Sequence, residues 1–153
     1  MCGGRSLRMG RDKARITYSQ FSEVDQQSRL YSLLENFCEK VVISCRADQV
    51  IPSGLNKVID REGISGPAAG LLSLHEALPE SAWLVVACDL PFVDHAVIEF
   101  LCTHRQSEMA ATVFGNEQGL LEPLFAIWEP RGLIELRKFV ATVSSARETC
   151  LAI

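Results

Sequence analysis

The first residues of the chain hold the pattern with the clearest chemical potential. The stretch Cys2–Lys13 (CGGRSLRMGRDK) carries three glycines and four cations within twelve residues. Glycines let backbone N–H groups approach an anion without a Cβ in the way, and nearby cations neutralise phosphate charge. The stretch matches neither GxGxxG nor a Walker A loop, because Gly10 is followed by Arg11 rather than by Lys-Ser or Lys-Thr. From the residues alone, a phosphate-binding loop and a flexible basic N-terminus both remain open.

Two aspartates are candidate ligands because each follows a short apolar segment. Asp60 comes after Val58 and Ile59, and Asp89 comes after the apolar run Trp83–Cys88. In an open α/β sheet ligands gather beyond the carboxyl ends of the strands, and carboxylate oxygens suit Mg²⁺. Each aspartate also has a structural alternative, since Asp89 could form a turn before Leu-Pro and Asp60 could cap the next turn.

Apolar periodicity predicts alternating helices and strands that would position these groups. Helical spacing predicts helices near residues 30–38 with Asp25 as a cap, 67–78, 94–102 and 132–140. Short apolar runs predict strands at residues 41–45, 58–59, 83–88, 110–114 and 120–128. The alternation favours an α/β fold with a mainly parallel sheet and right-handed crossovers.

The composition restricts the classes of partner. The 153 residues carry 15 Lys and Arg against 19 Asp and Glu, a net charge of −4, and 48% of them are hydrophobic. This mild acidity disfavours a broad nucleic-acid or membrane-surface partner, so any anion site should be local. The apolar runs are far shorter than the roughly 20 residues that span a bilayer, and six cysteines without CxxC spacing suit a reducing compartment. We therefore expect a cytoplasmic protein.

Four segments resemble, in the same order, the motifs of the molybdopterin-guanine dinucleotide biosynthesis protein A family within the nucleotidyltransferase superfamily. GGRSLRMGRDKA at residues 3–14 is similar to the signature loop GGxSxRMGxDKA. Asp60 followed by GPAAG at 66–70 resembles D…GPLAG. CDLPF at 88–92 resembles CDMPF, and EPLF at 122–125 resembles the EPLF or QPLF segment. Four motifs in one order make the resemblance specific.

The resemblance implies a three-layer Rossmann-like nucleotidyltransferase fold and transfer of GMP from GTP to molybdopterin, with release of pyrophosphate. The backbone of Cys2, Gly3 and Gly4 would cradle the nucleotide. Lys13 would lie on the phosphates and stabilise charge during transfer, and Arg8 would help to hold the pyrophosphate.

The resemblance also assigns roles to the two aspartates. Asp60 matches the acidic residue near the nucleotide, and Asp89 matches the residue that holds Mg²⁺ and shares in catalysis. The attacking phosphate is already ionised at neutral pH, so positioning and charge neutralisation are the main demands of the reaction.

The chain departs from the family pattern at both ends. The signature loop normally follows a hydrophobic first strand, whereas Met1 already stands in the place of the motif, and no Asn-x-Asn-x-Pro-x-Asp type segment occurs before Ile153. A parallel sheet without that strand would leave unpaired backbone groups and a gap in its core. We therefore expect residues 1–153 to form a single nucleotidyltransferase domain that lacks its first strand and C-terminal segment.

Two alternative functions remain open. A relative could use CTP or another acceptor, such as a sugar phosphate, although GPAAG favours the guanylyl branch over the cytidylyl branch. A non-catalytic nucleotide-binding protein could also retain this fold. The presence of Arg8, Lys13 and Asp89 argues against it. The expected partners are therefore GTP and molybdopterin.

Overall fold

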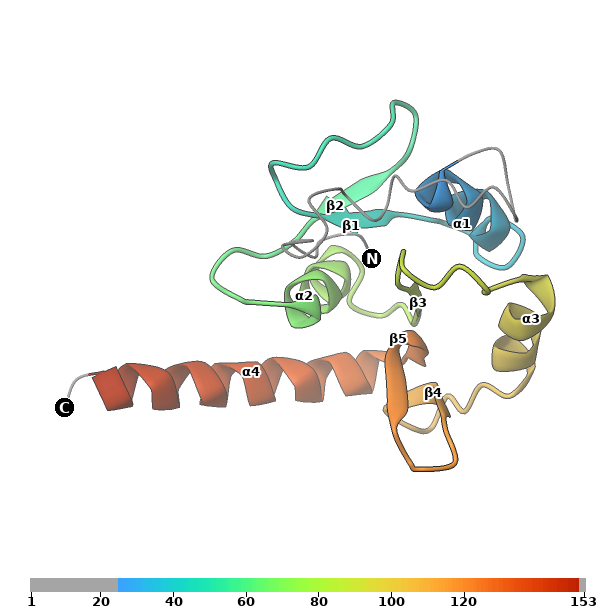
Figure 1. The fold of residues 1–153 in the computed structure, drawn as a ribbon. Coiled ribbons are helices and arrows are strands. Elements are labelled where there is room, and N and C mark those ends of the chain that lie inside the picture. The colour runs from blue at the N-terminus through green and yellow to red at the C-terminus, as the bar shows by residue number, and fades with distance from the viewer. Residues whose placement is uncertain (1–24, 152–153) are drawn as a thin grey trace.

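Helices and strands alternate along the described chain. The computed structural model describes residues 25–151, and the side chains up to residue 143. In chain order the described elements are α1 (Gln26–Leu34), β1 (Ile43–Cys45), β2 (Lys57–Ile59), α2 (Pro67–Ala77), β3 (Trp83–Val86), α3 (His95–Thr103), β4 (Ala111–Gly115), β5 (Leu121–Trp128) and α4 (Pro130–Leu151). The fold is a mixed α/β fold, and Figure 1 shows α4 extending away from the other elements.

Three helices begin where local sequence signals predict them. The carboxylate of Asp25 caps α1 and that of Asp94 caps α3, by accepting hydrogen bonds of 2.9 and 3.0 Å from backbone N–H groups of the first turn. α2 begins at Pro67, whose fixed φ suits the first helical position. α4 is longer than the predicted segment 132–140, because no further glycine or proline interrupts the sequence.

The strands form two sheets in the described residues. β1 and β2 are parallel, with Ile43 opposite Lys57 and Cys45 opposite Ile59. β5 lies between β3 and β4 and is antiparallel to both. One of the three described strand pairs is therefore parallel, and the expected mainly parallel sheet is not confirmed in this part of the chain.

The hairpin between β4 and β5 explains the antiparallel pairing. In its turn, Asn116 Oδ1 accepts hydrogen bonds from the backbone N–H groups of Gln118 and Leu120, each at 3.0 Å. Gly119 has a φ of +77°, a left-handed conformation that glycine adopts without a steric penalty. A turn this short joins antiparallel neighbours only. β5 therefore returns alongside β4 and presents its other edge to β3.

Helices pack against both faces of β3. One apolar cluster, which joins β3 and β5 to α1 and α3, contains Leu30, Val86, Val93, Ile98, Leu101, Phe125 and Ile127. A second cluster, which joins β3 to α2 and α4, contains Leu71, Leu74, Trp83, Val85 and Leu133. Successive side chains of a strand point to opposite faces, so Val85 and Val86 are buried on different sides of β3. The apolar run that predicted this strand thus reflects burial on both faces.

A third apolar cluster packs α1 against β1. It consists of Tyr31, Val41, Ile43 and Cys45 and is called the β1 cluster below. The Tyr31 hydroxyl donates to the carbonyl oxygen of Val41 at 3.1 Å, which ties the helix to the start of the strand.

The first turn of α4 is held tightly against the rest of the fold. Leu133 is fully buried, and a Cβ at Gly132 would collide with the carbonyl oxygen of Ala110. Farther along the helix, Phe139 is 66% exposed. Within residues 25–151, none of the helices has both the length and the apolar character needed to cross a membrane.

Candidate functional site

Asp60 is the first residue after β2, and two hydrogen bonds fix it to β1. Its backbone N–H donates to the carbonyl oxygen of Cys45 at 2.8 Å, and its Oδ1 accepts from Ser44 Oγ at 2.5 Å. Ser44 is 2% exposed, whereas Asp60 is partly exposed. This short, charge-assisted hydrogen bond orients the carboxylate at the carboxyl end of the parallel strand pair.

Asp89 is exposed and lies on the loop that leaves the carboxyl end of β3. The residue before it, Cys88, packs against the β1 cluster. That cluster includes Cys45, whose carbonyl group binds the backbone of Asp60. The backbone segments that carry the two predicted carboxylates therefore both adjoin the β1 cluster.

The remaining predicted site residues lie outside the described part of the chain. They are Cys2, Gly3, Gly4, Arg8 and Lys13. The structure therefore gives the positions of Asp60 and Asp89 only.

The carboxylate of Asp89 is a chemically suitable ligand for Mg²⁺. Mg²⁺ prefers oxygen ligands and is often held by one or two carboxylates together with waters and substrate phosphates. An exposed aspartate beyond β3 and a partly exposed one beyond β2 offer oxygen donors of this kind. In the described range, no group of three or more His, Cys, Asp or Glu side chains comes together as a possible metal site.

The structure adds three polar residues that the sequence did not single out. Ser44 holds Asp60, and Gln26 and Arg29 on α1 donate to backbone carbonyls of the loop that carries Asp89. A serine inside the apolar run VVISC is a weak signal of a polar role. Gln26 and Arg29 give no local signal, because their partners lie 62 to 64 positions away in the sequence.

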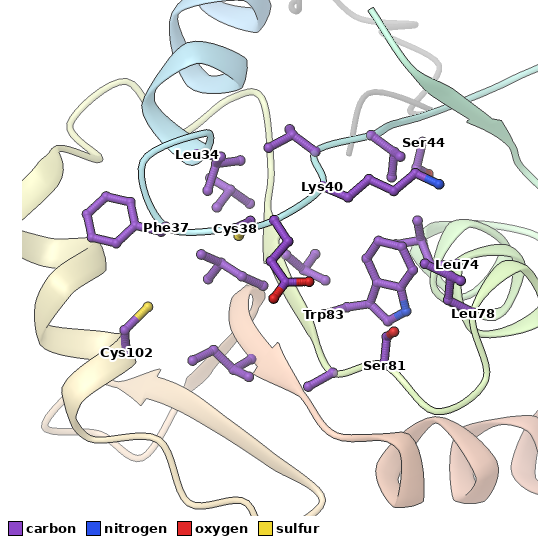
Figure 2. A pocket seen from close by; sticks show the side chains of 18 of the residues that line it. Leu34, Phe37, Cys38, Lys40, Ser44, Leu74, Leu78, Ser81, Trp83 and Cys102 are labelled. Carbon is purple, nitrogen blue, oxygen red and sulfur yellow. The ribbon is translucent and has the colours of Figure 1, made fainter.

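A cavity of about 770 Å³ lies between β1 and β3. Figure 2 shows Leu34, Ser44 and Trp83 around it, contributed by α1, β1 and β3. Trp83 Nε1 is buried and has no hydrogen-bond partner among the described residues. Because Ser44 binds Asp60, the cavity extends to a residue that holds a candidate carboxylate. The cavity is thus lined by residues from both of the described sheets.

Three described cysteines are poorly suited to chemistry, and two described histidines pack against aromatic rings. Burial raises the pKa of the thiols of Cys38, Cys45 and Cys102. The reactive thiolate form is therefore disfavoured at neutral pH. The rings of His95 and His104 lie against phenylalanine rings.

The fold and the site together define a mixed α/β protein with two carboxylates beyond the ends of its strands, which is where open α/β sheets bind their ligands. The model of the MobA-like NTP transferase domain family matches residues 1–149, and the chain belongs to this family. The resemblance drawn from the four sequence motifs is thereby confirmed.

Named relatives match this chain over part of their own length. A molybdenum cofactor biosynthesis bifunctional protein of Synechocystis is 33% identical over 137 residues, which cover 87% of this chain and 39% of the relative. A probable molybdenum cofactor guanylyltransferase of Clostridium perfringens is 30% identical over 131 residues, covering 84% of this chain and 63% of the relative. The chain thus spans less than two thirds of the length of either relative.

Solved structures show the same fold. Molybdopterin-guanine dinucleotide biosynthesis protein A from Archaeoglobus fulgidus matches 92% of this chain and 71% of its own, with a TM-score of 0.65 and 19% identity. A protein from Aquifex aeolicus matches 74% of this chain and 60% of its own, with a TM-score of 0.62 and 16% identity.

Proposed function

We propose that this chain is a nucleotidyltransferase that transfers GMP from GTP to molybdopterin and releases pyrophosphate. The curated relatives carry names from this biosynthesis, and the chain belongs to the MobA-like NTP transferase domain family. The proposed setting is the cytoplasm, with GTP and molybdopterin as the partners.

The placement of the two aspartates is the observation that carries the proposal. Asp89 follows β3, Asp60 follows β2, and both backbone segments adjoin the β1 cluster. Two carboxylates beyond strand ends can hold a cation next to a nucleotide phosphate. The Ser44 hydrogen bond keeps one of them oriented before any ligand binds.

Each proposed residue contributes binding or charge rather than proton transfer. Asp89 holds Mg²⁺, and Asp60 lies near the nucleotide. Lys13 and Arg8 neutralise the phosphates and the departing pyrophosphate, while the backbone of Cys2 to Gly4 cradles the nucleotide. Bound Mg²⁺ supplies further neutralisation of phosphate charge. The attacking phosphate is an anion at neutral pH, so this chemistry requires no general base.

We also propose that residues 1–153 belong to a single domain with a three-layer Rossmann-like fold, completed by one further strand and a C-terminal segment. Helices on both faces of β3 support the layered arrangement. The cavity between β1 and β3 supports the further strand, because a strand there would join the two described sheets into one.

Asp89→Asn tests the proposed reaction. The amide keeps the shape of the side chain but removes the charge that holds Mg²⁺, so we expect pyrophosphate release from GTP and molybdopterin to fall at least about a hundredfold, as for loss of one strong electrostatic contact. Glu80→Gln is the control, because it removes an exposed carboxylate on the turn before β3 by the same change to an amide.

The same assay separates the alternatives. Faster turnover and tighter binding with CTP would indicate the cytidylyl branch. Nucleotide binding without any pyrophosphate release would indicate a non-catalytic protein.

A further inference from the structure

The first turn of α1 holds the loop that follows β3. Gln26 Nε2 donates to the carbonyl oxygen of Leu90 at 3.1 Å. Arg29 donates twice, from Nη1 to the carbonyl oxygen of Val93 at 3.0 Å and from Nη2 to that of Pro91 at 3.1 Å. Three backbone carbonyls of this loop are therefore bound by two side chains of one helix.

The two donors also fix each other. Arg29 Nε donates to Gln26 Oε1 at 2.9 Å, which directs the amide nitrogen of Gln26 to the loop. Gln26 is 1% exposed, and residues three positions apart share a helix face. Asp25 caps α1 immediately before Gln26, so the cap fixes the start of the helix that carries both donors. The planar guanidinium and the buried amide therefore form one ordered unit.

Asp89 lies between two anchored neighbours. On one side Cys88 packs against the β1 cluster, and on the other side the Leu90 carbonyl accepts the hydrogen bond from Gln26. Asp89 itself is exposed. The path of the backbone between these anchors therefore sets the position from which its carboxylate extends.

We propose that Arg29, supported by Gln26, is a positioning residue that directs the Asp89 carboxylate toward the Mg²⁺ that accompanies the nucleotide. This inference rests on the role proposed for Asp89. Apolar packing of Leu30 and Val93 brings α1 near the loop. The hydrogen bonds to three loop carbonyls also fix the direction of the loop backbone, because hydrogen bonds are directional. A misplacement of about 1 Å can reduce a rate roughly a hundredfold, so a small loosening of this loop affects catalysis.

Substitutions at Arg29 separate the effect of its hydrogen bonds from the effect of its side-chain volume. Arg29→Met keeps much of the apolar stem and removes every donor, and Arg29→Lys restores one donor group. The matched control is Arg105→Met, which breaks the hydrogen bonds of another partly exposed arginine, made to Glu129. Each variant is measured for thermal unfolding, for amide exchange of residues 88–93, and for binding of Mn²⁺ with GTP by electron paramagnetic resonance.

We expect Arg29→Met to speed the amide exchange of residues 88–93 and to weaken Mn²⁺ binding, each by roughly tenfold, which corresponds to one net hydrogen bond. Arg29→Lys should recover part of both losses. Arg105→Met should lower the thermal midpoint and change neither of the other two readouts. In turnover, Arg29→Met should lower kcat and raise the Mg²⁺ concentration needed for half the maximal rate, with a smaller change in the KM for GTP.

The variant Asp89→Asn distinguishes this inference from the proposed function. If it weakens Mn²⁺ binding and Arg29→Met adds no further loss in that background, Arg29 acts through Asp89. If Asp89→Asn weakens Mn²⁺ binding but Arg29→Met lowers only the thermal midpoint, the positioning role is refuted and the proposed function stands. If Asp89→Asn leaves Mn²⁺ binding unchanged, the metal role of Asp89 and this inference are both wrong.

Discussion

At the scale of single residues, a buried serine holds one of the two candidate carboxylates. Ser44 Oγ donates to Asp60 Oδ1 at 2.5 Å from a position that is 2% exposed. A hydrogen bond to an ionised acceptor is stronger than one between neutral groups, so this contact selects one orientation of the carboxylate. The orientation of Asp60 therefore depends on β1 as well as on its own loop.

Ser44→Ala should loosen Asp60 and slightly destabilise the fold. We expect the free energy of unfolding to fall by about 1 kcal/mol and GTP binding to weaken by roughly threefold, because the carboxylate loses its fixed donor. Urea unfolding and titration with GTP measure the two effects. Ser73→Ala is the control, since Ser73 is also buried but donates to the carbonyl oxygen of Ala69 within α2. Equal losses of GTP affinity in both variants would show that Ser44 has no special role.

The sequence could locate some of these residues and not others. Asp60 and Asp89 follow apolar runs, and the end of such a run is a local pattern that can be recognised without a structure. Ser44, Gln26 and Arg29 act through partners that are distant in the sequence. Their contacts exist only after the strands and α1 have packed.

At the scale of elements, helix starts follow from local sequence signals, whereas strand pairing depends on residues that are distant in the sequence. Asp25, Pro67 and Asp94 mark helix starts by local chemistry, and the structure confirms all three. The insertion of β5 between β3 and β4 places Trp83 opposite Trp128, which is a long-range pairing. Alternating helices and strands suggest parallel neighbours, but the hairpin turn reverses the chain and makes these pairs antiparallel.

An ion pair joins the end of α3 to the junction of β5 and α4. Arg105 Nε and Nη2 donate to the two carboxylate oxygens of Glu129 at 2.7 and 2.9 Å. The hydrogen bond with Glu129 raises the pKa of Arg105, so the guanidinium stays charged. The Glu129 side chain is 4% exposed and that of Arg105 is 44% exposed. The carboxylate is thus the buried member of the pair.

Arg105→Met should destabilise the protein, because it leaves the buried carboxylate of Glu129 without its partner. We expect the free energy of unfolding to fall by about 2 kcal/mol, less than for a fully buried pair because Arg105 is half in water. Urea unfolding measures this loss. Adding Glu129→Gln removes the unpaired charge and should recover part of the stability. A double variant as unstable as the sum of the single variants would contradict this account.

At the scale of the whole molecule, a cavity lies between the two described sheets, beside apolar contacts that join them. Helices cover both faces of β3, and residues of β3 together with Ser44 of β1 line the 770 Å³ space. Apolar side chains such as Leu34, Leu74 and Ile127 line this space, so a segment that filled it would bury apolar surface. The further strand that we propose would fill this space.

A strand supplied to this cavity should stabilise the protein. We expect a strand-forming apolar extension of about six residues, a typical strand length, before Met1 to raise the thermal midpoint by roughly 4–8 °C relative to a Gly/Ser extension of equal length. That shift corresponds to about 2 kcal/mol in the free energy of unfolding at this chain length. We expect this small gain because the free energy of apolar burial exceeds only slightly the entropy cost of ordering the strand. The same extension should slow alkylation of Cys102, which lines the cavity. Identical midpoints and identical alkylation rates for the two extensions would mean that no strand occupies the space between β1 and β3.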